Sequence, residues 1–286
     1  MQRIWTAGDV LAWAARDFES RGMESPRLEA EVLLAHALSC RRIDLYTGFD
    51  RPLEPEDLAG FRGAVARRRS GEPSSYITGT REFWSLEIAV DPRVLVPRPD
   101  TEALVAAALD RISDGPVLDL GTGSGCVAVA IAIERPGIRV DAVDVSEGAC
   151  AVAAGNAARH GVGDRVAVLP GDLFDPLDPA ARYEAIVSNP PYVADSEIEA
   201  LSEEVRREPR VALAGGGDGL DAVRRIVGGA GGFLAPGGWL LLEVDPRRAH
   251  EVAAEICPRL AGAAGEVLRD LAGRDRVVVV RVPGGG

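Results

Sequence analysis

The residues of this chain best suited to chemistry are Asn189-Pro190-Pro191-Tyr192, which follow the short apolar run 186–188. Proline has no backbone N–H and fixes its own φ, and it pushes the preceding residue toward extended backbone. Two prolines in a row therefore hold the preceding carbonyl groups out of a helix or a sheet ladder. These carbonyls, the Asn189 amide oxygen and the Tyr192 ring form a set of acceptors against an aromatic wall. We interpret the segment as a site that holds a planar –NH2 group, in preference to an ordinary strand-to-loop turn.

A second candidate site lies upstream, where the apolar run 116–120 ends in Gly121, Gly123 and Gly125. Glycine permits positive φ and close approach of a ligand to the backbone. The helix expected at 126–134 would offer free N–H groups to a negatively charged ligand group. A further strand at 139–144 ends in Asp144, and an acid at this place after the loop commonly binds ribose hydroxyls. The combination predicts a nucleotide-type cofactor.

The glycine spacing indicates which cofactor class fits. A dinucleotide fingerprint reads G-x-G-x-x-G, whereas this loop reads G-x-G-x-G and has Cys126 next. A P-loop is excluded because the loop lacks the required lysine. With Asp119 two residues before it, the loop resembles the S-adenosylmethionine loop of Rossmann-like methyltransferases. Asp119 itself fits two roles equally, as a cofactor-site acid or as a structural acid that binds loop N–H groups.

The elements that must position these residues alternate between strand and helix, which predicts a parallel sheet covered by helices. Strands are expected near 116–121, 139–144, 165–169, 184–188, 238–244 and 276–282. Sites in such sheets lie at the carboxyl ends of the strands, so both motifs should face one crevice. The glycine cluster 215–219 predicts a loop.

The N-terminal part reads as a separate helical domain, residues 1–75. Helices are expected from Thr6 to Phe18, from Ser25-Pro26 to Leu38 and from Pro55 to Arg69, on their caps and apolar stripes. A dimerisation or stability domain and a docking module for a protein substrate fit this pattern equally well. Arg67–Arg69 at a helix end are expected to be solvated.

Residues 76–98 are expected to form a β-hairpin linker, and residues 99–286 the catalytic domain. The predicted strands are 83–90 and 94–96, with the turn at Asp91-Pro92. A helix is then expected to run through Leu109.

Composition excludes several function classes. The chain of 286 residues has a formal net charge of −12, which argues against tight binding to a phosphate backbone. There is no signal pattern at the N-terminus and no apolar run of membrane-spanning length. Three histidines and four scattered cysteines give no metal-site spacing. We therefore expect a cytoplasmic protein without a metal ion, without direct DNA binding and without membrane association.

Taken together, the chain resembles the release factor glutamine methyltransferases, the HemK/PrmC family, over essentially its whole length. The motifs that carry the resemblance are 81–84 (Arg-Glu-Phe-Trp), 96–102 (Val-Pro-Arg-Pro-Asp-Thr-Glu), 119–125, 188–192, 208–209, 217–221 and 270–277. The resemblance implies a class I S-adenosylmethionine-dependent α/β fold with a small N-terminal helical domain joined to it by a β-hairpin. It implies methyl transfer from S-adenosyl-L-methionine to the side-chain amide nitrogen (N5) of the Gly-Gly-Gln glutamine in class I peptide chain release factors. The product would be S-adenosyl-L-homocysteine, and we expect a monomeric enzyme.

Two alternatives share parts of this pattern. Adenine-N6 nucleic-acid methyltransferases share Asn-Pro-Pro-Tyr but need a basic target-recognition domain, which the sequence lacks. A sister family that methylates a glutamine of a ribosomal protein usually departs from Pro97-Arg98-Pro99. One segment departs from the resemblance, Val244-Asp245-Pro246-Arg247, and we expect it to be peripheral to the site.

The predicted roles can then be assigned residue by residue. The Asn189 side-chain oxygen and the Pro190 carbonyl would each accept one N–H of the substrate, with Pro191 and Tyr192 lining its site. The cofactor would contact the loop Gly121-Thr122-Gly123-Ser124-Gly125 and Asn189, with its ribose on Asp144. Asp172 would receive the adenine amino group and Leu173 would lie against the ring, although Asp172 also fits a helix N-cap. By resemblance, Arg98 and Pro99 would close over the cofactor.

Overall fold

The computed structural model describes residues 4–261 and 265–284, which form two compact units. The first unit comprises Met1–Thr80 and Ser202–Arg207, and the second comprises Arg81–Leu201 and Glu208–Gly286. Each unit has its own hydrophobic core.

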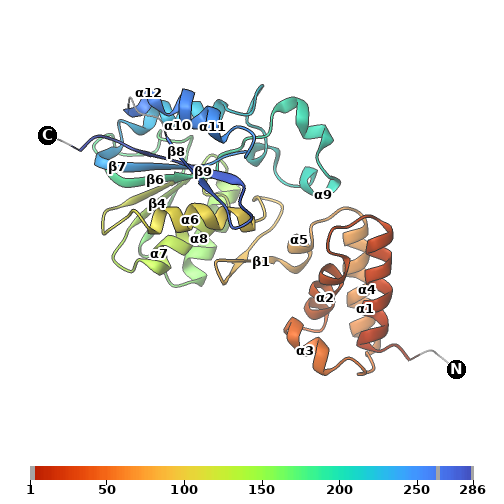
Figure 1. Cartoon of the computed structure of the whole chain (residues 1–286). Helices are drawn as coiled ribbons and strands as arrows, with labels where there is room; N and C mark the ends of the chain where they lie inside the picture. Colours follow the sequence, from red (N-terminus) through yellow and green to blue (C-terminus); the bar gives the residue numbers. More distant parts are fainter. Residues whose placement is uncertain (1–3, 262–264, 285–286) are drawn as a thin grey trace. The chain divides into compact units, whose positions relative to one another are not determined.

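The first unit is helical, as expected. Its helices are α1 (Ala7–Ser20), α2 (Pro26–Ala37), α3 (Arg42–Thr47), α4 (Pro55–Arg69), α5 (Ser74–Thr78) and α9 (Glu203–Arg206) (Figure 1). Thr6 and Asp9 form the capping box that starts α1, with Asp9 N–H donating to Thr6 Oγ1 at 3.2 Å and Thr6 N–H to Asp9 Oδ2 at 3.1 Å. The predicted starts of α1, α2 and α4 are confirmed. Helices α3 and α5 were missed because each is too short to show a helical period.

Arg68 joins segments of the first unit that lie far apart in sequence. It is 5% exposed and donates to Glu29 of α2 at 2.7 Å and to Glu204 of α9 at 2.6 Å. The expectation that Arg67–Arg69 are merely solvated was therefore wrong for Arg68. A buried guanidinium needs paired acceptors, and the second acceptor comes from a segment that no local pattern assigns to this unit.

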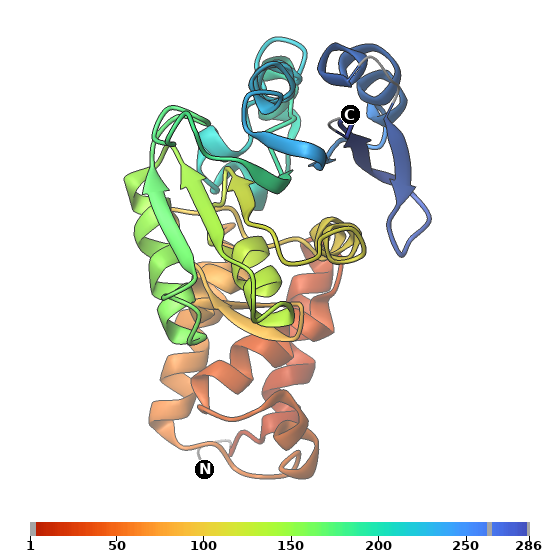
Figure 2. The ribbon, with the colours of Figure 1, turned by 90° about the vertical axis from the view of Figure 1, so that its left-hand side faces the viewer.

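The second unit contains a seven-stranded sheet in the order β5-β4-β3-β6-β7-β9-β8. The strands are β3 (Val117–Leu120), β4 (Val140–Asp144), β5 (Val166–Pro170), β6 (Tyr183–Ser188), β7 (Leu234–Glu243), β8 (Glu266–Arg269) and β9 (Asp275–Arg281). Strands β3 to β7 pair in parallel, whereas β9 is antiparallel to β7 and β8. Figure 2 shows β3, β4 and β5 side by side with their arrowheads at the same end.

Helices cover both faces of this sheet. Helices α6 (Glu102–Leu109), α7 (Cys126–Glu134) and α8 (Glu147–Arg159) lie on one face, and α10 (Asp221–Ala230), α11 (Ala249–Glu251) and α12 (Pro258–Ala261) lie on the other (Figure 1). Short helical turns are η1 (Pro99–Thr101), η2 (Asp195–Ala200), η3 (Arg210–Ala212) and the π-helical η4 (Val252–Ile256). The predicted α/β fold class is confirmed; β8 was missed, and β7 begins earlier than predicted. Within the described residues, no helix combines the length and the apolar character needed to span a membrane.

The hairpin exists, but its predicted turn was wrong. Its strands are β1 (Thr80–Phe83) and β2 (Leu86–Ala89), and residues 94–96 form no strand. The turn is Trp84-Ser85, with φ of 53° and 58°. Two consecutive residues with left-handed backbone conformation match the twist of the strands in a β-hairpin. The error has a physical reason, because neither residue carries the Asn or Gly signal for such a turn, whereas Asp91-Pro92 does.

Candidate active site

The carboxyl ends of the parallel strands surround a cavity of about 380 Å³ in the second unit. It is lined by seven of the residues predicted from the sequence, namely Gly121, Gly123, Asp144, Asp172, Leu173, Asn189 and Pro191. These residues follow β3, β4, β5 and β6, so the structure brings both motifs to one crevice. The volume falls in the range of small-molecule and cofactor sites.

The glycine loop after β3 adopts a backbone that favours glycine. Gly121, Gly123 and Gly125 have φ of 71°, 56° and 79°, and a Cβ on Gly125 would lie 3.0 Å from the Cβ of Ala153 in α8. Asp144 holds this loop, since one carboxylate oxygen accepts the Gly123 N–H at 2.9 Å and the other accepts the Ser146 N–H at 2.9 Å. A carboxylate offers about four acceptor positions, so Asp144 retains capacity for a ribose hydroxyl.

Three of the predicted cofactor residues, Thr122, Ser124 and Gly125, do not line the cavity. Thr122 is buried and donates its hydroxyl to Asp119 at 2.7 Å. Ser124 is also buried, and its carbonyl accepts a bond from Asn156 of α8 at 2.8 Å. The geometry gives these residues a role in shaping the loop; a direct contact with the cofactor stays a prediction.

Asp119 is buried beside the glycine loop. It is 2% exposed, accepts from the Thr122 hydroxyl and also receives a backbone hydrogen bond from Ala128 in α7. Burial raises its pKa to about 7, the Thr122 bond opposes that rise, and the charge of Asp144 adds to it. Of the two roles left open, the geometry favours support of the loop.

Asp172 and Leu173 lie at the cavity, as predicted, but Asp172 is not a helix N-cap. No helix of the described chain begins there, and the carboxylate pairs with Arg225 of α10 at 2.8 Å. Arg225 also lines the cavity, although no motif in the sequence assigns it to the site. Leu173 has a φ of 53° and packs against the core of the second unit.

Asn189 is held by a residue that the sequence did not predict. Its Nδ2 donates to Thr101 Oγ1 at 3.1 Å, and Thr101 is 2% exposed. Among the contacts of the described residues, none involves the Asn189 Oδ1 or the Pro190 carbonyl oxygen. Asn189 lines the cavity, whereas Pro190 is buried and does not line it, so contact of the Pro190 carbonyl with a ligand stays a prediction.

The loop 215–219 packs directly on the backbone of this motif. A Cβ on Gly215 would lie 2.7 Å from the Pro191 carbonyl oxygen, and one on Gly219 would lie 2.4 Å from the Tyr192 carbonyl oxygen. Gly219 also has a φ of 82°. Only glycine permits this approach, so the cluster predicted merely as a loop also supports Pro191 and Tyr192.

Arg98 and Pro99 do not line the cavity. The Arg98 guanidinium donates to Glu208, which is 4% exposed and also accepts the Val96 N–H at 3.1 Å. Arg98 thus ties the segment before η1 to the start of the loop that precedes η3. That Arg98 and Pro99 close over the cofactor remains a prediction.

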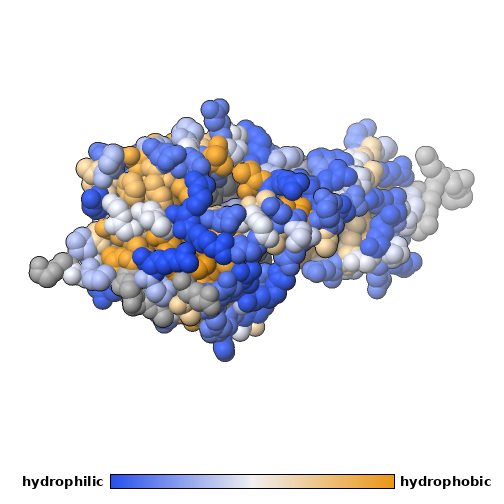
Figure 3. All heavy atoms as spheres, turned by 90° about the horizontal axis from the view of Figure 1, so that it is seen from above, coloured by the Kyte–Doolittle hydropathy of each residue, from blue (hydrophilic) through white to orange (hydrophobic). Residues whose placement is uncertain are grey.

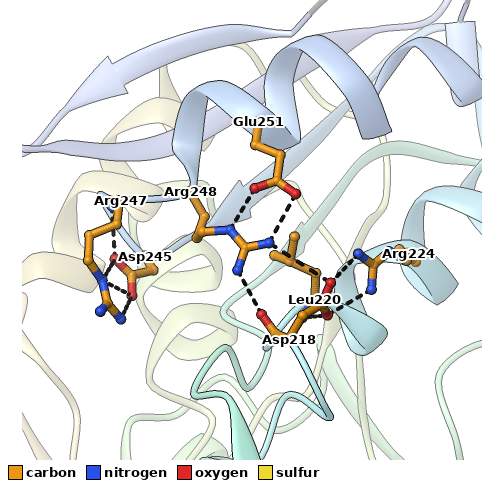
Figure 4. A network of polar contacts seen from close by, with 7 residues as sticks. All are labelled: Asp218, Leu220, Arg224, Asp245, Arg247, Arg248 and Glu251. Carbon is orange, nitrogen blue, oxygen red and sulfur yellow. Dashed lines mark hydrogen bonds and ion pairs between the residues drawn. The ribbon is translucent and has the colours of Figure 1, made fainter. Parts of the chain in front are cut away.

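A second cavity, of about 230 Å³, lies beside Tyr192. Charged residues form most of its wall, namely Glu197, Asp218, Asp245, Arg247 and Arg248. Figure 4 shows Arg248 bridging Asp218 and Glu251, while Arg247 pairs with Asp245. The segment 244–247 was expected to be peripheral. Asp245 and Arg247 line this second cavity with Tyr192 and do not line the cavity of the glycine loop, so the expectation stays a prediction.

Figure 3 gives a wider view of the second unit, from the side of α10 and α12. Bands of hydrophilic residues separate its exposed apolar areas.

Tyr192 itself lines the second cavity and not the first. Burial and the nearby Glu243 carboxyl raise the pKa of its phenol. The ring is therefore neutral at ordinary pH and acts as an apolar wall with a polar tip.

The fold and the site define a class I S-adenosylmethionine-dependent methyltransferase. Residues 9–79 match the family model "PrmC N-terminal domain", and residues 99–225 match "Methyltransferase small domain". A solved methyltransferase from Pyrococcus furiosus has the same fold, with a TM-score of 0.53 and 20% identity over 70% of this chain and 90% of that one.

Sequence comparison with related proteins identifies the family within this class of methyltransferases. The chain is 47% identical to the release factor glutamine methyltransferase of Geobacter sulfurreducens, over 98% of both chains. It is 44% identical to that of Rhodopirellula baltica, over 96% of this chain and 95% of the relative. The chain therefore belongs to the release factor glutamine methyltransferase family.

Proposed function

We propose that this enzyme transfers the methyl group of S-adenosyl-L-methionine to the N5 amide nitrogen of the Gly-Gly-Gln glutamine in class I peptide chain release factors. The observation that supports this most directly is the position of Asn189, which lines the same cavity as Gly121, Gly123 and Asp144 and bonds Thr101 through its Nδ2. We further propose that it acts in the cytoplasm as a monomer, without binding DNA.

The chemistry explains why acceptors are needed. An amide nitrogen is a poor nucleophile because its lone pair is conjugated with the carbonyl group, as its ~18–20 kcal/mol rotation barrier indicates. Asn189 Oδ1 and the Pro190 carbonyl would each accept one N–H at roughly 2.7–3.2 Å. This fixes the nitrogen for in-line attack on the sulfonium methyl, and the acceptor dipoles favour the positive charge that develops on it.

No strong base is required in this mechanism. After transfer, the N-methylated cation is acidic and loses its proton readily to water. The groups that would hold the cofactor are the glycine loop, Asp144 and, for the adenine, Asp172 with Leu173. When bound, S-adenosyl-L-methionine supplies an electrophilic methyl group and leaves as S-adenosyl-L-homocysteine.

Transfer of label from S-adenosyl-L-methionine to a purified class I release factor tests the proposal. A factor with Gln→Ala in its Gly-Gly-Gln loop, a ribosomal-protein extract and unmethylated DNA serve as comparison substrates. Label on the wild-type factor alone is the expected result. Label on DNA or on a ribosomal protein, with none on the release factor, would refute it.

A further inference from the structure

Beneath the Asn189 motif lies a buried polar cluster that the mechanism above does not use. Its centre is Glu243, the last residue of β7, which is 1% exposed. Ser188 pairs with Leu242 in the parallel register of β6 and β7. Asn189 and Glu243 each follow one member of that pair, so both lie at the same level along the sheet.

Thr101 connects the two residues. Its hydroxyl receives the Asn189 Nδ2–H at 3.1 Å, and the same side chain lies close enough to Glu243 to lower the pKa of that carboxyl as a hydrogen-bond donor. We infer that Thr101 and Glu243 are positioning residues, which hold the Asn189 amide with its Nδ2 toward the protein and its Oδ1 toward the substrate. This inference rests on the function proposed above.

The direction of the hydrogen bonds follows from the donor inventory. An ionised carboxylate can only accept, and a threonine hydroxyl has one proton to donate. If Thr101 directs that proton toward Glu243, as its effect on the pKa of Glu243 indicates, only its lone pairs are left for the Asn189 Nδ2–H that it accepts. The amide must then present its –NH2 group to Thr101, and the oxygen faces the other way.

Protonation of Glu243 would remove this constraint. A neutral carboxyl can donate to Thr101, which could then donate to Oδ1 and so turn the –NH2 toward the substrate. An –NH2 group cannot accept a substrate N–H. The orientation that supports catalysis therefore requires the ionised form of Glu243.

Several groups set the charge of Glu243. Burial raises its pKa to about 7; the Thr101 bond and the charges of Arg276 and Arg98 oppose the rise, and the charge of Asp100 adds to it. The charge of Glu243 in turn raises the pKa values of Tyr192 and Cys126, which lie near it. The ionised fraction rises with pH through about 7, so turnover should rise over the same range.

One feature argues against a purely structural role. Glu243 Oε2 is buried and, among the described residues, has no hydrogen-bond partner. A buried charge with an unpaired oxygen costs stability relative to a well-packed apolar residue. Its presence is explained if the carboxylate serves to orient Asn189.

The decisive comparison is between Thr101→Val, which keeps the shape but removes the hydroxyl, and Thr101→Ser, which keeps the hydroxyl. We expect Thr101→Val to lower kcat by about 10- to 100-fold, the loss of one or two strong hydrogen bonds, with the cofactor Kd unchanged within about threefold. Thr101→Ser should recover most of the lost kcat. Thr122→Val, the same change in the glycine loop, should instead act on the cofactor Kd.

A pH profile separates positioning from packing. In the wild type, kcat should rise through about pH 7, and in Glu243→Gln this step should disappear. Asp119→Asn is the control for the step, because the pKa of Asp119 is also raised to about 7, and its profile should keep the step. Equal losses in Thr101→Val and Thr101→Ser, or a step that persists in Glu243→Gln, would overturn the inference.

A measurement without substrate keeps this result separate from the proposed function. The side-chain amide signals of Asn189, observed by NMR in 15N-labelled enzyme, should shift through about pH 7 in the wild type and stay constant in Glu243→Gln. Signals that do not respond to pH in the wild type would refute the positioning role, whatever the enzyme methylates. Failure of the wild type to label the release factor would refute the proposed function alone.

Discussion

The glycine loop after β3 and the Asn189 motif after β6 each rest on a buried threonine and carboxyl, but the two pairs are assembled differently. Thr122 bonds Asp119 within a single loop. Thr101, by contrast, lies in η1 and Glu243 at the end of β7. The first pair can form as soon as its loop folds, whereas the second requires that the sheet has closed around it.

The two pairs also differ in how well the carboxyl is satisfied. Asp119 accepts from Thr122 and from the backbone of Ala128, while Glu243 keeps one oxygen without a partner among the described residues. Burial raises the pKa of both to about 7. We infer that Asp119 stabilises the backbone of the glycine loop, whereas Glu243 would orient Asn189, the side chain proposed to hold the reacting nitrogen.

The largest expected effect comes from removing that side chain. Asn189→Ala deletes one of two acceptors for the substrate amide, and we expect kcat to fall by about 10³-fold, the scale of losing one preorganised polar group at a reacting centre. The Kd of S-adenosyl-L-homocysteine, measured by calorimetry, should change no more than a few-fold. Comparable losses in both quantities would remove the distinction between the two regions.

The second prediction concerns Asp119 and the pH dependence of stability. Its folded pKa, about 7, lies above the unfolded value of about 3.9. The native state therefore binds more protons than the unfolded state between these values, so its stability falls as pH rises through this range. Asp119→Asn has no such proton to lose.

Urea denaturation at pH 5 and pH 7 measures this effect. We expect the wild type to lose about 2–3 kcal/mol more than Asp119→Asn over this interval, at ~1.4 kcal/mol per pH unit. Glu243 titrates in the same pH range in the wild type and in Asp119→Asn. Subtracting the stability loss of one protein from that of the other therefore leaves the contribution of Asp119. Equal slopes would mean that Asp119 is ionised in the folded state.

The same contrast explains what the sequence could and could not predict. The glycine loop and Asp144 lie within one strand–loop–helix–strand run, and the structure brings them together at the cavity. Asn189 was found because two prolines mark it, but Thr101 and Glu243 carry no local signal of a shared contact. The partner of Arg68 was missed for the same reason, because Glu204 lies far away in the sequence. The turn at Trp84-Ser85 was also missed, and Trp84 there bonds Glu102 and Glu134, which are likewise distant in sequence.

A smaller effect is expected where the 215–219 loop supports Tyr192. Gly219→Ala places a Cβ 2.4 Å from the Tyr192 carbonyl oxygen at a φ of 82°, so the backbone must shift. We expect a loss of about 2 kcal/mol in the free energy of unfolding and a lower kcat. Gly217→Ala is the matched control, because a Cβ there would have no neighbour within 4 Å, and a similar loss in that variant would remove the assigned contact.

The smallest effect should appear in the better satisfied region. Asp144→Asn keeps the shape of the side chain but replaces one acceptor oxygen with an –NH2 group, which cannot receive both loop N–H groups and a ribose hydroxyl. We expect the Kd of S-adenosyl-L-homocysteine to rise by about tenfold, which corresponds to ~1.4 kcal/mol for one charge-assisted hydrogen bond. Turnover at saturating cofactor should change little, because Asn189 and its support are intact. A fall in kcat larger than that of Thr101→Val would instead mean that the glycine loop positions the reacting groups, and the separation between a binding region and an orienting region would fail.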